Sequence, residues 1–311
     1  MNMKIKQLII KIIYPIIFVR RKIIATYIKY LQEHNLKKLS EVMYKMTTGK
    51  KLNWDSPEDL NEKIHWLQFN TDTSTWTKLA DKYLVREYIE EKGLSNILVK
   101  LYGVWDDVDK IDFQSLPKSF VLKSNHACGT VLLVKDKAKL NLPETRKLLN
   151  EWLKLKMGKR TAEPHYDQIK PLIIAEEYLI PDNGDLMDYK IFMAGGKPQL
   201  ILVCSERKIG DGCKLSIYDT EWNIRPEWLA GAHSNDCVSF IPKPKTLSQM
   251  LITAEILSKD FPQVRVDFYE VNGTLYFGEL TFTSAAGNMT YISHDKLLDM
   301  GKKVILPTTT I

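Results

Sequence analysis

The stretch VRVDFYEVNGTLYFGELTFTSAAG, residues 264–287, has the pattern of two β-strands joined by a turn at Asn272-Gly273. Three ionised residues, Arg265, Asp267 and Glu279, stand among its Val, Phe, Tyr and Leu residues. A buried charge is costly unless it is paired or binds something. The three residues therefore indicate either an internal ion pair or a binding site.

The register of this hairpin separates the two interpretations. A two-residue turn at Asn272-Gly273 pairs positions whose numbers sum to 545, which puts Asp267 and Glu279 on opposite faces. A loop of three or five residues, or a bulge, brings both carboxylates to one face. They would then suit Mg²⁺, which takes one or two carboxylates plus substrate phosphates. A metal site thus requires that the turn is not the simple two-residue hairpin, whereas an ion pair with Arg265 does not.

The composition excludes several classes of protein. A length of 311 residues with 44% hydrophobic content predicts about two domains with real cores. The four cysteines form no C-x-x-C pair and the six histidines form no cluster, which argues against a zinc site or a disulfide framework and favours a reducing cytoplasm. Beyond residue 32 the charges nearly cancel, so the basic pI of 8.9 does not indicate nucleic-acid binding.

Residues 1–32 form a separate unit, a basic amphipathic helix. They carry seven Lys or Arg and no acid, and their apolar residues recur at helical spacing. The longest uncharged run, residues 12–19, contains Pro15 and is shorter than the roughly 20 residues of a membrane span. We interpret the helix as lying on an anionic membrane surface. Packing against the body or a partner chain is the alternative.

The remaining pattern predicts an α+β fold with antiparallel hairpins and helices. Helices are expected at 56–68, 77–92, 143–156 and 246–259, and after Ser293. Ser56 is the expected capping residue of the first of these helices. Strands are expected at 97–104, 119–123, 131–134, 172–180, 189–193 and 199–204, followed by the hairpin quoted above. Thr246 and Gln249 have the spacing of a capping box. Residues 205–245 contain many turn formers, and no order is predicted for them.

Further charged residues stand at the ends of the predicted strands. Lys123 leads into the polar loop 125–130, where backbone N–H groups could cover a phosphate, although a lysine at a strand end is more often simply solvated. Glu176 ends an apolar strand, as an edge residue or as a hydrogen-bonding site. Asp188 and Lys190 are two apart and therefore point to the same side of their strand.

Five segments in this order resemble an ATP-grasp enzyme, and more closely the teichuronopeptide-biosynthesis (TupA-like) ATP-grasp family of surface-polysaccharide gene clusters. They are LADKYLVREYIEEKG, SFVLKSNHACGTVLLVKDK, LIIAEEYL, DYKIFMAGGKPQLI and the hairpin, between about Lys78 and Gly287. The resemblance implies an ATP-grasp fold, in which two α+β subdomains with antiparallel sheets grip ATP. The expected division is the helix 1–32, a helical region 33–118, a first subdomain 119–180 and a second subdomain 181–306 with the metal site.

The resemblance also implies roles for individual residues. Lys82 and Lys123 would neutralise the ATP phosphates beneath the loop that carries Asn125, His126 and Gly129. Glu176 would accept from the adenine amino group, the backbone of Tyr178 and Leu179 would hold the ring edge, and Asp188 would bind the ribose. Lys190 would face the phosphates or the acceptor, Arg265 would stabilise the transferring phosphoryl group, and Asp267, Glu279 and Thr281 would hold Mg²⁺. Thr281 stands where many relatives have Asn, and the loop reads HACG where relatives tend toward HGSG.

The reaction expected from this resemblance is that of an ATP- and Mg²⁺-dependent carboxylate–amine ligase. Phosphorylation of a carboxylate gives an acylphosphate that an amine can attack, with no protein nucleophile. The expected acid is a uronic acid of a capsule or other surface polysaccharide, or of its precursor, and the partner is an amine or amino acid. The protein is expected in the cytoplasm, at the inner face of the cell membrane. A kinase acting on a sugar or polysaccharide, and a non-catalytic protein of the membrane surface, are the alternatives.

Overall fold

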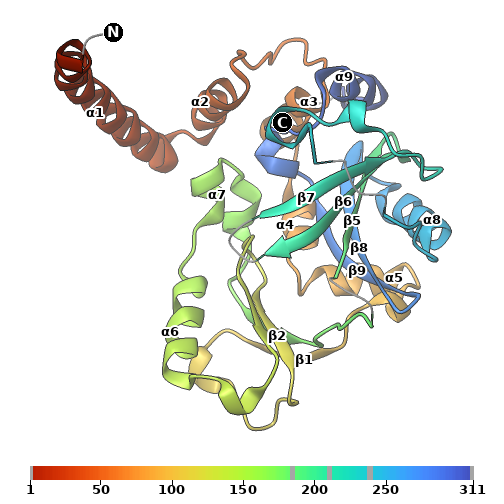
Figure 1. Cartoon of the computed structure of the whole chain (residues 1–311). Helices are drawn as coiled ribbons and strands as arrows, with labels where there is room; N and C mark the ends of the chain where they lie inside the picture. The colour runs from red at the N-terminus through yellow and green to blue at the C-terminus, as the bar shows by residue number, and fades with distance from the viewer. Residues whose placement is uncertain (1–2, 183–185, 209–211, 237–240, 309–311) are drawn as a thin grey trace.

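Two antiparallel sheets form the body of the protein (Figure 1). The computed structural model describes residues 3–182, 186–208, 212–236 and 241–308. The first sheet has four strands in the order β1-β4-β2-β3, and the second has five in the order β7-β6-β5-β8-β9. The predicted α+β fold with two antiparallel sheets and helices is therefore confirmed.

The elements have the following bounds. The first sheet contains β1 (Leu101–Trp105), β2 (Phe120–Ser124), β3 (Val131–Val134) and β4 (Ile173–Glu176), and the second contains β5 (Asp188–Ala194), β6 (Lys197–Lys208), β7 (Gly212–Tyr218), β8 (Gln263–Val271) and β9 (Thr274–Thr281). The helices are α1 (Met3–His34), α2 (Leu36–Thr48), α3 (Leu60–Asn70), α4 (Ser74–Ala80), α5 (Val85–Glu91), α6 (Leu142–Leu153), α7 (Met157–Thr161), α8 (Leu247–Ser258) and α9 (His294–Lys303). Short 3₁₀ turns join them, among them η4 (Pro164–Gln168).

The hairpin β8–β9 contains both a two-residue turn and a bulge. Asn272 and Gly273 have φ of 54° and 77°, as in a type I′ turn. The regular register runs from the turn to the pair Phe268–Phe277, and then Gly278 is inserted, so that Asp267 pairs with Glu279. Of the arrangements expected to bring both carboxylates to one face, the bulge is the one present, and it does so although the turn itself has two residues. A Cβ on Gly278 would lie 3.0 Å from the carbonyl oxygen of Asp267, which explains the glycine.

Two predicted helix caps were wrong, although the second of these helices begins directly after Thr246 as expected. The helix expected from Ser56 begins at Leu60, because the Asp59 side chain accepts from the N–H of Glu62 and is the actual cap. The capping box at Thr246 does not form. The Thr246 hydroxyl donates to the Glu270 carboxylate at 2.6 Å instead.

The helix predicted over 77–92 is interrupted. It divides into α4 and α5, because the Asp81 carboxylate accepts from the N–H groups of Tyr83 and Leu84 and ends the first helix there. The N–H of Lys82 then donates to the carbonyl of Asn125 at 3.2 Å. The break thus fixes Lys82 beside the loop that follows β2.

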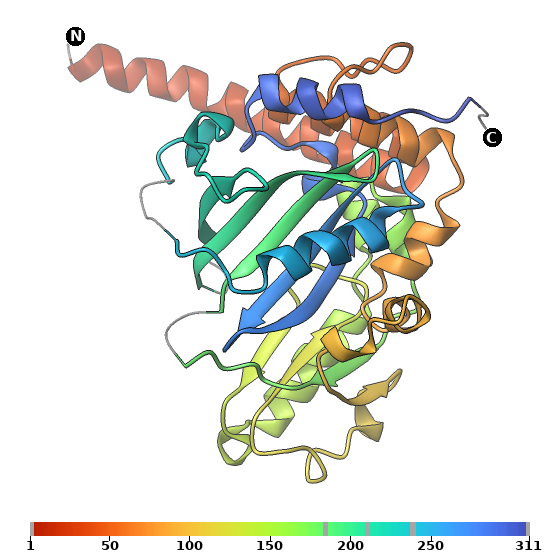
Figure 2. The same cartoon turned by 90° about the vertical axis from the view of Figure 1, so that its right-hand side faces the viewer.

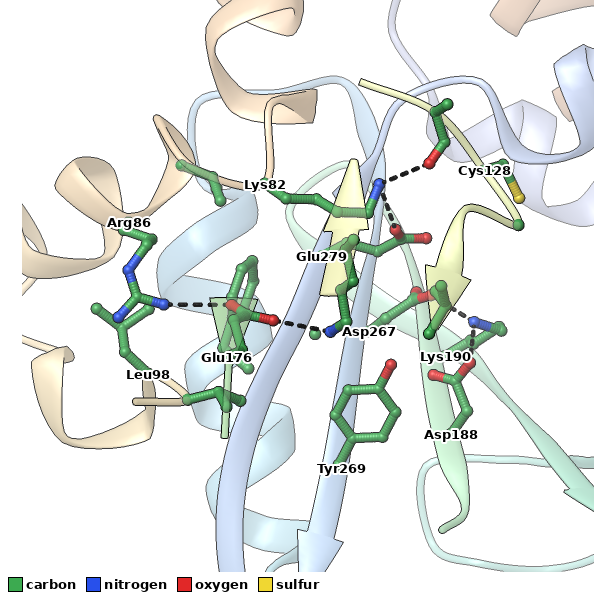
Figure 3. A pocket seen from close by; sticks show the side chains of 18 residues that line it. Lys82, Arg86, Leu98, Cys128, Glu176, Asp188, Lys190, Asp267, Tyr269 and Glu279 are labelled. Atoms are coloured by element: carbon green, nitrogen blue, oxygen red, sulfur yellow. Dashed lines mark hydrogen bonds and ion pairs between the residues drawn. The ribbon is translucent and has the colours of Figure 1, made fainter. Parts of the chain in front are cut away.

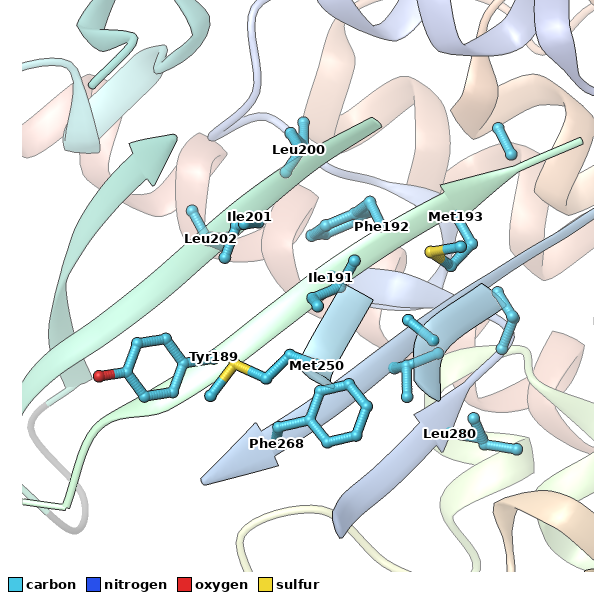
Figure 4. Close-up of a cluster of buried hydrophobic side chains, with 14 of the residues drawn as sticks. Tyr189, Ile191, Phe192, Met193, Leu200, Ile201, Leu202, Met250, Phe268 and Leu280 are labelled. Carbon is cyan, nitrogen blue, oxygen red and sulfur yellow. The ribbon is translucent and has the colours of Figure 1, made fainter. Parts of the chain in front are cut away.

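Helices cover the outer faces of the two sheets. The main core joins the five-stranded sheet to α3, α8 and α9, with Ile191, Met250 and Phe268 at its centre (Figure 4). A second core joins the four-stranded sheet to α6 through Leu149 and Trp152. Figure 2 shows α8 lying across one face of the larger sheet. Each sheet thus has its own core, closed by its own helices.

The predicted N-terminal helix is present as α1. Its C-terminal end packs through Leu31 against Leu39 of α2 and Ala162 beside α7, and Glu33 forms an ion pair with Lys159. The other end extends away from the body (Figures 1 and 2). From residue 18 on, where the side chains of the helix are described, the large apolar ones that are exposed are Phe18, Val19, Ile23, Tyr27 and Tyr30. Within the described ranges, none of the helices is apolar over the length that crossing a membrane requires.

Candidate active site

A charged pocket lies between the two sheets (Figure 3). Its walls are built by β2 and β4 of the smaller sheet, by β5, β8 and β9 of the larger sheet, and by the corner between α4 and α5. The charged residues that line it are Lys82, Arg86, Lys123, Glu176, Asp188, Lys190, Asp267 and Glu279. Seven of these eight were predicted from the sequence, and Arg86 was not.

One row of charges crosses the larger sheet. Lys190, Asp267 and Glu279 are direct cross-strand neighbours on β5, β8 and β9. The ammonium of Lys190 lies 2.5 Å from Asp267 Oδ2 and 2.6 Å from Asp188 Oδ2. Burial alone would lower the pKa of Lys190, but the two carboxylates raise it above its ordinary value. Lys190 is therefore a fixed positive charge in this row.

Arg265 joins the two carboxylates of the row. Its Nε lies 2.6 Å from Asp267 Oδ1, and its Nη2 lies 2.7 Å from Asp267 Oδ2 and 3.0 Å from Glu279 Oε1. The same Nη2 donates to the Thr281 hydroxyl at 3.0 Å. The ion pair considered from the sequence is thus formed, and it includes both carboxylates.

Glu279 faces positive charge on three sides. Burial would raise its pKa, but Lys82, Arg265 and Lys190 together lower it to about 2, so the carboxylate is ionised at neutral pH. Lys82 Nζ lies 3.9 Å from Glu279 Oε2 and donates to the carbonyl of Ala127 at 3.2 Å. Lys82 consequently bridges the carboxylate row and the loop after β2.

The donors present fit a magnesium ion. Within the described residues, no group of three or more His, Cys, Asp or Glu side chains gathers as a ready metal site. Mg²⁺ needs only one or two protein carboxylates when phosphate oxygens complete its shell. Asp267 and Glu279 share one face and offer oxygen donors of that kind, although both are bonded here to Arg265.

The opposite wall carries a second charge cluster. Lys123 Nζ lies 2.8 Å from Glu176 Oε2, and Arg86 Nη1 lies 3.5 Å from Glu176 Oε1. Burial alone would lower the pKa of Lys123, but Glu176, Tyr269 and Glu279 together raise it above its ordinary value, so the ammonium stays charged. Arg86 stands four residues after Lys82 in the segment LADKYLVREYIEEKG, and this helical spacing could have indicated it.

The loop 125–130 contributes three residues to the pocket and two to its own support. Gly129, with φ of 75°, lines the pocket together with Ala127 and Cys128. Asn125 and His126 are buried: the Asn125 amide donates to Asp81 Oδ2 at 2.9 Å, and His126 Nε2 lies 3.3 Å from the carbonyl of Leu155. The contacts of Asn125 and His126 therefore position the loop rather than face the pocket.

Two predicted residues after β4 lie outside the pocket lining, and one tyrosine that was not predicted belongs to it. Tyr178 and Leu179 follow β4, are half-buried and are not among the described residues that line the pocket. Tyr269, which was not predicted, points its phenol toward the charged row (Figure 3). It stands two residues after Asp267, on the same face of β8, and this spacing was the available signal.

Comparison with known sequences identifies the family. The TupA-like ATP-grasp profile matches residues 62–304, which is most of the chain and includes both walls of the pocket. The chain belongs to this family. The membership confirms the resemblance of the five segments and shows that this is an ATP-grasp protein. Among curated proteins, no relative was found.

Solved structures with a similar arrangement are ATP-grasp enzymes of low identity. The D-alanine–D-alanine ligase of Bacillus anthracis has 16% identity and a TM-score of 0.47, over 76% of this chain and 69% of that one. An ADP complex of the N5-carboxyaminoimidazole ribonucleotide synthetase PurK has 13% identity and a TM-score of 0.41, over 71% and 50%. The ATP-grasp ligase PsnB with a minimal precursor has 11% identity and a TM-score of 0.40, over 77% and 67%.

Proposed function

We propose that this ATP-grasp protein is a carboxylate–amine ligase that uses ATP and Mg²⁺. Its acid would be a uronic acid of a capsule or other surface polysaccharide, or of its precursor, and its second substrate a small amine or amino acid. The observation that carries the proposal is the row Lys190–Asp267–Glu279, which faces Lys123 and Lys82 across one pocket. Such a pocket suits a polyphosphate bound between cations and metal-binding carboxylates.

Each predicted residue has a place in this proposal. Lys82, Lys123 and Lys190 would bind phosphate oxygens, and Arg265 would stabilise the transferring phosphoryl group. Glu176 would accept a hydrogen bond from the adenine amino group, and the backbone of Tyr178 and Leu179 would hold the edge of the adenine ring. Asp188 would bind the ribose. Gly129 would let the loop, which Asn125 and His126 hold in place, approach the phosphates. Asp267 and Glu279, assisted by Thr281, would hold Mg²⁺, which neutralises charge that develops on the phosphates.

The chemistry needs positioning and charge stabilisation rather than a protein nucleophile. An oxygen of the substrate carboxylate attacks the γ-phosphorus, and the bond to the β-phosphate oxygen breaks to release ADP. The amine nitrogen then attacks the acyl carbon, phosphate leaves, and the amine gives up a proton. Arg265 is fixed by Asp267 and Glu279, so its guanidinium is held ready for the negative charge of the first step.

We further propose that the enzyme works in the cytoplasm at the inner face of the membrane. The exposed apolar side chains of α1, which include Phe18 and Ile23, stand beside Arg20, Arg21 and Lys22. This composition suits a helix that lies on anionic lipid. Residues 33–118 would then form the region that precedes the ATP-grasp fold, 119–180 its first subdomain and 181–306 its second. We propose no role for the protein in binding nucleic acid.

The reaction is tested by measuring ADP and phosphate over a matrix of uronic acids crossed with amines. A ligase releases both products only when acid and amine are present together. Release of ADP without phosphate and with a single acceptor would identify a kinase instead. Nucleotide binding without turnover in the whole matrix would favour a non-catalytic protein of the membrane surface. Glu279→Ala should abolish turnover in a protein that still unfolds cooperatively, and retained turnover would contradict the metal role.

The membrane interaction is tested by sedimentation with vesicles that contain phosphatidylglycerol. Deletion of residues 1–32 should release the protein from these vesicles. Phe18→Ser with Ile23→Ser should have the same effect, whereas Ile252→Ser with Ile256→Ser on exposed positions of α8 is the matched control and should not. If the deleted protein stays bound, or the full chain never binds, the membrane role is refuted.

A further inference from the structure

Arg86 is the charged residue that lines the described pocket without a role in the proposed function. It lies on α5 directly after the buried Val85, and both residues line the pocket. The side chain of Arg86 is 15% exposed, and within the described ranges its ion pair is with Glu176. Figure 3 shows Arg86 beside Glu176, on the side away from Lys190. Arg86 therefore belongs to the end of the pocket at which Glu176 stands.

The wall next to Arg86 is apolar. Leu98 and Val99 line the pocket, and Figure 3 shows Leu98 close to Arg86. Apolar walls with a few fixed polar groups are typical of sites for small organic molecules, in which the polar groups determine orientation and specificity. At this end of the pocket, the polar groups are those of the Arg86–Glu176 pair.

The two oxygens of the Glu176 carboxylate face different cations. Lys123 Nζ lies 2.8 Å from Oε2, and Arg86 Nη1 lies 3.5 Å from Oε1. Glu176 pairs with Val121 of β2, which fixes its backbone in the sheet, and its side chain is 9% exposed. An ionised carboxylate accepts hydrogen bonds and donates none. Held in this state, Glu176 favours a ligand group that carries N–H over one that presents a carbonyl oxygen.

Binding of a nucleotide would change the balance around Glu176. Under the proposed function Lys123 binds a phosphate oxygen, which weakens its bond to Glu176. Arg86 would then be the cation that remains beside a nearly buried carboxylate. A buried carboxylate without such a partner binds a proton or turns away. Because a protonated carboxyl group can also donate to a carbonyl oxygen, its preference for an N–H group would be lost.

We propose that Arg86 is a positioning residue for base selection, which maintains the charge and orientation of the Glu176 carboxylate so that the pocket prefers a 6-aminopurine nucleotide to a 6-oxopurine nucleotide. The proposal rests on the function proposed above, in which Glu176 accepts from the adenine amino group. It adds the residue on which this selection depends. Arg86 acts through Glu176 and does not bond to the base.

The test compares the binding of ATP and of inosine triphosphate, which has a carbonyl oxygen in place of the amino group. Isothermal titration calorimetry with Mg²⁺ and without acceptor measures binding to the full chain and needs no turnover. The native protein should bind inosine triphosphate at least about tenfold more weakly than ATP, because a hydrogen bond to a charged group is lost. In Arg86→Met this ratio should fall below about threefold, mainly because ATP binds more weakly.

Two further variants separate this role from a structural one. Arg86→Lys keeps a cation beside Glu176 and should restore most of the ratio. Arg146→Met is the matched control, since Arg146 pairs with Asp109 at 3.2 Å and is not among the described residues that line the pocket. Its ratio should equal that of the native protein. A similar loss in Arg146→Met would overturn the proposal in favour of a general loosening of the fold.

Other outcomes would also overturn the proposal. An unchanged ratio in Arg86→Met, or equal binding of both nucleotides by the native protein, would show that Arg86 does not govern base selection. Equal weakening of ATP, inosine triphosphate and inorganic tripolyphosphate would show that Arg86 contacts phosphate. A greater loss for inosine triphosphate than for ATP would show a direct bond to the base. If no pair of acid and amine supports turnover while the ratio still depends on Arg86, the inference stands and the proposed reaction fails.

Discussion

Lys190→Met is the most informative single change in the charged row. The ammonium of Lys190 separates two nearly buried carboxylates, since the side chains of Asp188 and Asp267 are 4% and 2% exposed. Removing one partner from a buried ion pair costs about 3–5 kcal/mol. Asp267 keeps both bonds from Arg265, so we expect the lower end, about 3 kcal/mol. At about 2 °C per kcal/mol for a protein of this size, Tm should fall by about 6 °C.

Magnesium should restore part of this loss. In the native protein the carboxylates are held by Lys190 and Arg265, so Mg²⁺ without nucleotide should raise Tm by less than about 1 °C. In Lys190→Met, Asp188 and Asp267 lack the ammonium, and a divalent cation can take its place. At a concentration tenfold above Kd, Mg²⁺ should add about 1.4 kcal/mol, or about 3 °C. Thermal unfolding followed by circular dichroism, with and without Mg²⁺, measures both effects.

The control for Lys190→Met is Lys197→Met on the adjacent strand. Lys197 pairs with Glu255 at 3.1 Å, but its side chain is 71% exposed, so its loss should cost less than about 1 kcal/mol. Equal falls in Tm for the two variants would show that the row does not hold buried charges. If Mg²⁺ raises the Tm of the native protein and of Lys190→Met equally, the idea that a divalent cation can replace the ammonium of Lys190 is refuted.

Three other changes test separate parts of the site. Lys123→Met should weaken ATP binding at least tenfold, measured by equilibrium dialysis, and unchanged affinity would remove its phosphate role. Burial raises the pKa of Glu163 from an ordinary 4.5 to about 7, so the folded state binds the proton more tightly than the unfolded state. The free energy of unfolding should therefore fall by up to about 3 kcal/mol as the pH rises from 4.5 through 7. Glu163→Gln should abolish that fall in urea unfolding, and an unchanged slope would contradict it. In Gly278→Val the added side chain should clash with the carbonyl oxygen of Asp267 and displace its carboxylate, so that turnover is lost while Tm changes little. Normal turnover would show that the bulge tolerates a side chain.

Much of the fold was predictable because local patterns agree with it. Each expected strand is present, and α9 begins directly after Ser293 as predicted. The break between α4 and α5 was not predictable, because the apolar spacing continues across it. It depends on the Asp81 carboxylate and on the bond from Lys82 N–H to Asn125, a residue more than forty positions away. Contacts between distant segments override helical propensity at this point.

The bulge in the hairpin shows a different limit. The type I′ turn follows from Asn272-Gly273 alone, and the prediction of a two-residue register was correct close to the turn. Farther from the turn, two residues of β9 have different requirements. Phe277 packs in the main core, whereas Glu279 has to contact Arg265. Only an inserted residue meets both demands, and only Gly278 fits beside the backbone of Asp267. The sequence contains the glycine, but the reason for it lies in the pairing of the strands.

The loop after β2 shows why residue type alone overestimates a site. Asn125 and His126 stand in the polar loop before Gly129 and were predicted to belong to the nucleotide site. Asn125 instead uses its amide for Asp81 and for the carbonyl of Lys170, and its Oδ1 accepts from Leu172 N–H. Buried polar groups must be satisfied, and here the segments that pack against the loop satisfy them. Burial, which the sequence does not report, decides between a ligand and a support.

The two interpretations of the charged hairpin, ion pair and metal site, are compatible once the charges are counted. Among the described residues at the pocket, the cations are Lys82, Arg86, Lys123, Lys190 and Arg265, and the carboxylates are Glu176, Asp188, Asp267 and Glu279. The net charge is +1, and the cations lower the cost of burying the carboxylates. A nucleotide phosphate would attract the lysines, and the carboxylates they leave would need a new cation, which Mg²⁺ supplies. The internal ion pairs therefore preserve the site without nucleotide, and under the proposed function they would be exchanged for phosphate and metal, so that the same residues serve both states.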